Sequence, residues 1–362
     1  MKWLLDILNK MRPQFGHGRR LERLHPLFEA VDKFLFSPET PTAGAPHIRD
    51  PLDLKRYMSM VIVAMLPCTL ASVYFFGLRV LLIILLSYAV GGAVEVLFAI
   101  IRKEPINEGF LVTGLVFPLI LPPGLPLWMV AAGIAFGVII GKELFGGTGR
   151  NLYNPALVGR CFLFLGYPVA LSSGWVVPGT GLTGRLLHYV DASKIDAITK
   201  ATPLGLAKQG TWESISHLFL GNVAGSIGET SGLAILAGGL FLCLTKVANW
   251  RTVAGILLGT VLLQSALHQT MPTSTGSALW HIGAGGLLFG AFFMATDPVT
   301  SPATNVGKWI YGFLIGVVTI LIRNFSGYVE GMMFAILFGN TIAPLIDQVV
   351  YSQQLRTLSY EK

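Results

Sequence analysis

Charged residues are scarce in this sequence: Asp, Glu, Lys and Arg make up 12% of the 362 residues, whereas 53% are hydrophobic. Soluble globular domains carry about twice that share of charge. Apolar runs long enough to cross a bilayer core of about 30 Å recur along most of the chain, which excludes a single anchor on a soluble domain. The composition therefore predicts one polytopic integral membrane protein.

Cysteine is also rare, and the common catalytic motifs are missing. The three cysteines have no CxxC spacing and the seven histidines do not cluster with them, so we expect neither a disulfide framework nor a metal site built from these residues. The sequence contains no nucleophile elbow, P-loop or HExxH motif, and no catalytic side chain is predicted.

The formal charge of +7 does not indicate nucleic-acid binding, because ten of the 26 Lys and Arg residues lie in the first 56 residues, immediately before the first apolar span. The tendency of basic residues to remain on the cytoplasmic side explains this position better. An even number of spans then places both termini in the cytoplasm. Most short loops predicted to lie outside carry no basic residue.

We predict an all-α membrane protein with about ten transmembrane helices. Several spans are short and bounded by Pro or Gly, which predicts broken or re-entrant helices that line a cavity or are buried in protein. The expected division is a cytoplasmic basic segment over 1–56, a membrane domain over 57–350 with a longer outer loop at 173–229, and a cytoplasmic tail over 351–362. The predicted spans are 57–75, 80–101, 109–121, 126–144, 155–172, 230–247, 252–268, 283–296, 308–323 and 331–350.

Two carboxylates lie within predicted spans, where a charged side chain is costly and usually marks an ion or proton path. Glu95 follows Gly91 and Gly92 in YAVGGAVEVLF, and Asp347 lies in NTIAPLIDQVV. Asp297 lies at a span end. We predict that Glu95 and Asp347 belong to a cation path; the alternative, open for Asp297 and Asp347 above all, is an interfacial carboxylate at a helix N-terminus.

The sequence GSIGETSG places Ser226 three residues before Glu229, the spacing of a capping box that opens a helix. Free N–H groups at such a helix N-terminus could instead hold a phosphate. Both interpretations remain open from the sequence, with capping favoured.

Long stretches of the chain resemble the NqrB/RnfD family, and in particular the NqrB subunit of the sodium-translocating NADH:quinone reductases. These stretches cover most of residues 47–348, and the related RnfD subunit of the Rnf complex shares the membrane core. The basic leader containing HPLFEAVDKFLFSPETP favours NqrB. The residues that carry the resemblance are HIRDPLDLKRYM, RKEPINEGFLVTGLVFPLILPPGLPLW, GKELFGGTGRNLYNPALVGR, GNVAGSIGETS, MATDPVTS, GKWIYGFLIGVVTILIR and EGMMFAILFGNTIAPLIDQ.

The resemblance implies a covalent flavin on the outer loop. In this family a threonine in the pattern D-x-x-S/T-G-A-T carries FMN through a phosphoester, and DAITKAT places Thr202 at that position. Lys200 stands where the family usually has glycine, and a residue with a Cβ is strained if the turn needs a positive φ. A separate flavin transferase would attach the FMN, which explains why no catalytic partner accompanies Thr202. Ser226 and Glu229 are expected near the FMN.

The resemblance also implies an electron path and partners. Electrons would pass from this FMN to a noncovalent riboflavin near the cytoplasmic side and then to ubiquinone, coupled to sodium export by a six-subunit assembly in a bacterial inner membrane, with the Thr202 loop in the periplasm. Because amide and carboxyl groups match the alternating donors and acceptors of a flavin ring, Asn151, Asn154 and Asp297 are predicted riboflavin contacts.

The resemblance further places the quinone site at Gly91 and Gly92, where close helix packing is the alternative. A permease without redox chemistry would account for the broken helices and buried carboxylates but not for DAITKAT. An accessory assembly subunit would account for neither.

Overall fold

The computed structural model describes residues 13, 54–103, 109–178, 202–271 and 275–360, and this part of the chain is helical, without strands. The long helices are α3 (Leu54–Phe76), α4 (Arg79–Arg102), α6 (Leu127–Gly141), α13 (Trp250–Thr270), α16 (Asn305–Phe325) and α17 (Met332–Tyr360). The shorter ones are α5 (Gly109–Leu119), η3 (Glu143–Phe145), α7 (Pro155–Gly166), α8 (Pro168–Ser173), α10 (Pro203–Ala207), α11 (Ile215–Leu220), α12 (Gly232–Leu244), α14 (Ala278–Gly283), α15 (Leu287–Phe289) and the π-helix η5 (Gly290–Met294).

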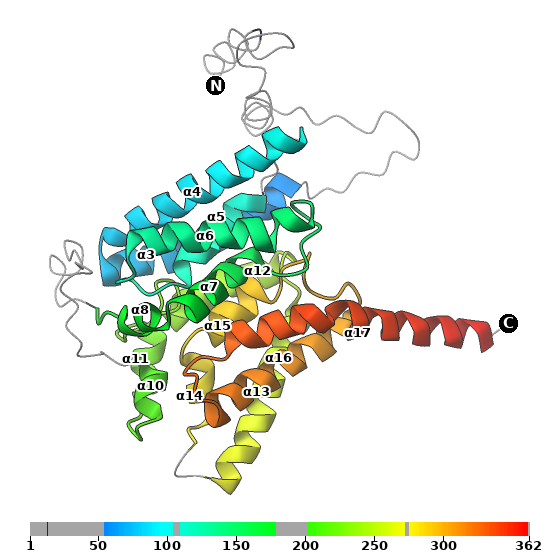
Figure 1. The fold of residues 1–362 in the computed structure, drawn as a ribbon. Helices are drawn as coiled ribbons and strands as arrows, with labels where there is room; N and C mark the ends of the chain where they lie inside the picture. The colour runs from blue at the N-terminus through cyan, green and yellow to red at the C-terminus, as the bar shows by residue number, and fades with distance from the viewer. Residues whose placement is uncertain (1–12, 14–53, 104–108, 179–201, 272–274, 361–362) are drawn as a thin grey trace.

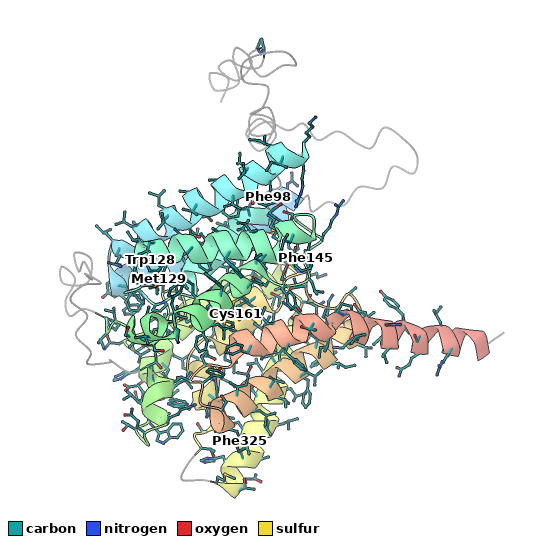
Figure 2. The ribbon with its side chains drawn as sticks, in the orientation of Figure 1. Phe98, Trp128, Met129, Phe145, Cys161 and Phe325 are labelled. Carbon is teal, nitrogen blue, oxygen red and sulfur yellow. The ribbon has the colours of Figure 1, made fainter. Side chains whose placement is uncertain are left out.

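Within these described ranges, six helical segments are long and apolar enough to cross a membrane, and α5, α7 and α12 are shorter apolar helices. Large apolar side chains are exposed on their outer surfaces, among them Leu85 and Leu262. Exposed Trp128 and Phe145 lie at opposite ends of the α6 and η3 segment (Figure 2). The predicted class, an all-helical multi-pass membrane protein, is confirmed.

Helices α13 and α16 run in the same direction and pack closely, because glycines line their contact (Figure 1). A Cβ on Gly312 would clash with the carbonyl oxygen of Thr252, and one on Gly316, about one turn later, would clash with that of Ile256. Small residues that allow backbones to approach are typical of helix contacts in membranes.

Some of the short helices occupy the centre of the molecule. In Figure 1, α7, α12 and α15 lie between a group formed by α3 to α6 and a second group formed by α13, α16 and α17. Direct contacts of α12 with α3 and of α7 with α17 join these groups. Fully buried Phe117, Leu157, Phe289 and Tyr311 belong to the continuous core that results. The broken segments predicted from Pro and Gly are therefore interior elements.

Local sequence sets where these central helices begin and end. Asn154 is the N-cap of α7, where its side-chain oxygen accepts a hydrogen bond from the Ala156 N–H at 3.0 Å, and Pro155 occupies the first helical position. Both are preferred residues at those places. The helix ends at Gly166, and Pro168 opens the separate helix α8. An apolar stretch that could have been one span is thus divided.

The C-terminal helix is longer than the sequence predicts. The predicted span ends at 350, but α17 continues to Tyr360 and projects from the body of the molecule (Figure 1). Pro344 lies inside the helix without ending it. Residues 351–356 are all exposed, so the predicted tail begins as a solvent-accessible continuation of the last helix.

Candidate functional site

A cavity in the described part of the chain, which we call the Thr202 cavity, has a volume of about 410 Å³. This lies within the roughly 300–1,000 Å³ of small-molecule sites. Helices α7 and α8, the start of α10 and the segments around residues 223–230, 283–285 and 327–330 form it. Its wall includes Arg160, Phe164, Trp175, Thr202, Ser226, Glu229, Tyr328 and Glu330.

Thr202 is the N-cap of α10 and is half-buried in the wall of this cavity. Its hydroxyl oxygen accepts a hydrogen bond from the Gly205 N–H at 3.3 Å, and Pro203 follows at the first helical position. The cap fixes the threonine side chain beside the cavity. Residues 196–201 of the DAITKAT motif, including Lys200, lie outside the described residues.

Ser226 and Glu229 line the same cavity as Thr202. Their predicted role as a capping box is wrong, because α12 begins at Gly232 and its N-cap is Ser231, which accepts a hydrogen bond from the Ala234 N–H at 3.4 Å. Ser226 and Glu229 instead belong to the turn before that helix, where the Thr230 hydroxyl donates to the Ser226 carbonyl oxygen at 2.9 Å. The turn places both side chains at the cavity.

A buried ion pair joins Arg160 of α7 to Glu229, with 3.3 Å between the guanidinium nitrogen and the carboxylate oxygen. Gly286 allows this arrangement, because a Cβ there would clash with the Glu229 carboxylate. Burial raises the pKa of Glu229 against the opposing effect of Arg160. Sequence reasoning missed Arg160, since its partner lies 69 residues away in the chain.

A second ion pair lies at the edge of the same cavity. Arg323 contacts Glu330 at 2.9 Å and also donates to the carbonyl oxygens of His281 and Ala284. Although burial alone would raise the pKa of Glu330, Arg323 and the Gly286 N–H hold that pKa below its usual value. Two buried cations thus lie at or beside the Thr202 cavity, each matched by a carboxylate.

A smaller cavity of about 80 Å³, which we call the Asn154 cavity, brings together all three predicted riboflavin contacts: Asn151, Asn154 and Asp297 line it, with Lys142 beside them. Asp297 accepts hydrogen bonds from the Val299 N–H at 3.3 Å and the Thr300 hydroxyl at 3.0 Å. These polar groups match the edge of a flavin ring. The volume is below the range of about 300 Å³ and upward found for whole ligands, so a bound flavin would require the walls to move apart.

The two cavities lie toward opposite ends of α7. Asn154, its N-cap, lines the Asn154 cavity, and Phe164, near its C-terminus, lines the Thr202 cavity. A helix of 12 residues is about 18 Å long at 1.5 Å per residue. Helices α5 and α12 are of similar length.

The two predicted cation-path carboxylates have different surroundings. The Glu95 carboxylate contacts the Lys142 ammonium at 2.7 Å, and both side chains are buried. Asp347 of α17 is half-buried beside the start of α16, where it accepts from the Ala303 N–H at 2.7 Å and the Thr304 hydroxyl at 2.6 Å. Glu95 is therefore charge-paired within the protein, whereas Asp347 caps a loop before a helix.

The two glycines predicted for the quinone site have different surroundings. A Cβ on Gly91 would lie 2.6 Å from the Phe110 ring and 2.8 Å from Ile134, whereas one on Gly92 would make an ordinary 3.5 Å contact with Phe110. Gly91 is buried and Gly92 half-buried on α4. Helix packing therefore needs glycine at 91 only.

Replacing Gly91 with alanine is expected to destabilise the protein by ~1–3 kcal/mol, as overpacking of a core does, while Gly92→Ala leaves assembly intact. Thermal melting of the purified variants measures the difference. If the quinone packs at this face, Gly92→Ala also raises the apparent KM for quinone with normal flavin content. Equal melting temperatures for the two variants would contradict the packing assignment.

The chain is similar to known proteins over nearly its whole length. The model of the NQR2, RnfD, RnfE family matches residues 41–356. The chain is 42% identical to the Na(+)-translocating NADH-quinone reductase subunit (NqrB) of Azotobacter vinelandii, over 96% of this chain and 97% of the relative. It is 38% identical to the subunit of the same name from Klebsiella pneumoniae, over 98% of each chain. This extent of similarity shows that the chain is a member of the NQR2, RnfD, RnfE family.

Proposed function

We propose that this chain is the membrane redox subunit, NqrB, of a sodium-pumping NADH:ubiquinone reductase, carrying FMN as a phosphoester on Thr202. The observation that carries the proposal is the position of the Thr202 hydroxyl in the wall of a cavity of about 410 Å³. The curated relatives at about 40% identity bear the name of this reductase subunit. The partners would be the other subunits of the complex, a flavin transferase, ubiquinone and sodium.

The residues of the Thr202 cavity fit an FMN attached to Thr202. Apolar and aromatic side chains such as Phe164 and Trp175 offer flat surfaces for the ring, and Arg160 offers a cation at the same wall. Bound FMN would supply the electron transfer chemistry, while the protein supplies position and electrostatics. Arg160 would favour negative charge in the cavity, and Glu229 would hold Arg160 in place.

Riboflavin is proposed for the Asn154 cavity because of its polar groups. The amides of Asn151 and Asn154 can each donate and accept, and Asp297 accepts from neighbouring groups of its own turn. We assign the Thr202 cavity to the periplasmic side and the Asn154 cavity to the cytoplasmic side, as the basic loop residues indicate. Release of riboflavin from the denatured wild-type complex tests whether a noncovalent flavin is bound.

The test of the overall function is quinone reduction by membranes that contain the complete complex. With NADH as donor, we expect ubiquinone reduction to accelerate when sodium chloride replaces choline chloride at constant ionic strength. Membranes from cells lacking this chain are the control. A rate that is independent of sodium, in a complex with full flavin content, would contradict the sodium-pumping role.

Glu95 is proposed to bind the transported sodium ion, because a buried carboxylate in a span usually marks an ion path. Glu95→Gln, which keeps the side-chain size, is expected to raise the sodium concentration for half-maximal quinone reduction by about tenfold or more, equivalent to ~1.4 kcal/mol. The same titration on Asp347→Asn tests the second carboxylate. Unchanged sodium dependence in both single variants would remove these residues from the path.

A further inference from the structure

Lys142 occupies the position that a transported cation would need at Glu95. Its ammonium lies 2.7 Å from one Glu95 carboxylate oxygen, and both side chains are almost fully buried, at 3% and 7% exposure. The second carboxylate oxygen, Oε2, has no hydrogen-bond partner in the part of the chain that the structure describes. One carboxylate oxygen of Glu95 is therefore paired with Lys142, and the other has no hydrogen-bond partner among the described residues.

We propose that Lys142 is a tethered cation that competes with sodium for Glu95, so that the ion binds only when Lys142 changes partner. This inference rests on the proposed sodium role of Glu95. Removing the cation from a buried ion pair leaves an uncompensated charge and is strongly destabilising, and hence Glu95 requires either the ammonium or a replacement cation.

The Asn154 cavity offers Lys142 a second set of polar partners. Lys142 itself forms part of the cavity wall, together with the carboxylate of Asp297 and the amides of Asn151 and Asn154. A lysine ammonium on its flexible four-carbon stem is suited to exchange between partners. The ammonium therefore has polar partners whether it faces Glu95 or the cavity.

Charge balance couples this exchange to electron flow. A negative charge in the cavity, such as a reduced flavin bound there would supply, would favour the Lys142 ammonium at the cavity wall. The single negative charge left on Glu95 would then be matched by one sodium ion. Loss of that cavity charge would return the ammonium to Glu95 and displace the ion. The exchange at Glu95 itself moves only the two cations and needs no proton transfer.

The test uses the purified complex and measures melting temperature, which does not depend on turnover. Lys142→Met removes the competing cation, so sodium should become the partner of Glu95 and stabilise the complex by mass action. At pH 8, where a carboxylate remains ionised most readily, we expect the variant to melt at a higher temperature in sodium chloride than in choline chloride. The wild type and the control Lys246→Met, which removes an exposed lysine, should melt alike in both salts.

Two further variants separate competition from simple structural damage. Lys142→Met should lower the sodium concentration for half-maximal activity severalfold, whereas Lys142→Arg should raise it, because a guanidinium holds a carboxylate more firmly. Adding Glu95→Gln to Lys142→Met should remove the sodium effect on melting. Equal melting of Lys142→Met in the two salts, or an unchanged sodium requirement in Lys142→Arg, would overturn the proposal. A wild-type complex that contains no flavin, or whose activity sodium does not stimulate, would instead contradict the proposed function.

Discussion

Thr202→Val is expected to abolish covalent flavin on this chain. Valine has nearly the same shape as threonine but no hydroxyl, so no phosphoester can form. The purified chain, denatured and separated on a gel, should lose its flavin fluorescence under ultraviolet light completely. The spans should still fold, since Thr202 contributes only the cap of the five-residue helix α10, and replacing a cap costs about 0.5–2 kcal/mol.

A matched control is available on the same loop. Thr211 is an exposed threonine nine residues after Thr202, and Thr211→Val should retain wild-type fluorescence. Fluorescence of the Thr202→Val chain at the wild-type level, in cells that contain the flavin transferase, would move the attachment to another residue. Loss of fluorescence in both variants would mean that the loop as a whole, rather than one hydroxyl, is required.

Arg160→Met is expected to destabilise the complex by ~3–5 kcal/mol, because it leaves the Glu229 carboxylate buried without its cation. Both members of the pair have side chains less than 8% exposed, so water cannot replace the guanidinium. Thermal melting of the purified complex measures the loss. The proposed covalent flavin should also become harder to reduce, since a positive charge at the wall of its cavity is removed.

The double variant Arg160→Met with Glu229→Gln separates the two causes. It removes the unpaired charge and should recover much of the stability, while the flavin stays without its neighbouring cation. Arg150→Met, at an exposed arginine, should change the stability by no more than about 0.5 kcal/mol. Melting of Arg160→Met at the wild-type temperature would mean that Glu229 has another partner.

The spans could be predicted from the sequence because hydropathy is a local signal. Each predicted span contains a helix, and those expected to be broken by Pro and Gly are the short central helices, such as α7 with Pro155 at its start. The end of α17 was missed, since residues 351–360 are polar but continue the helix. Hydropathy detects the membrane segment and not the length of the helix that contains it.

The residues of the candidate site were likewise predicted only in part. The resemblance indicated Thr202 and the three groups at the Asn154 cavity, and the structure gathers each set at one cavity. Lys142 and Arg160 were not predicted, because each pairs with a carboxylate 47 or 69 residues away. A basic residue near a span end is explained by membrane sidedness alone, and only the fold shows which ones are buried partners.

Peptide mass spectrometry of the chain tests the central claim most directly. Trypsin cuts after Lys200 and Lys208, which releases residues 201–208 as one peptide that contains a single hydroxyl side chain, that of Thr202. We predict that this peptide, from a complex made in cells with the flavin transferase, carries the added mass of one FMN joined with loss of water. An unmodified 201–208 peptide as the dominant species would contradict the account.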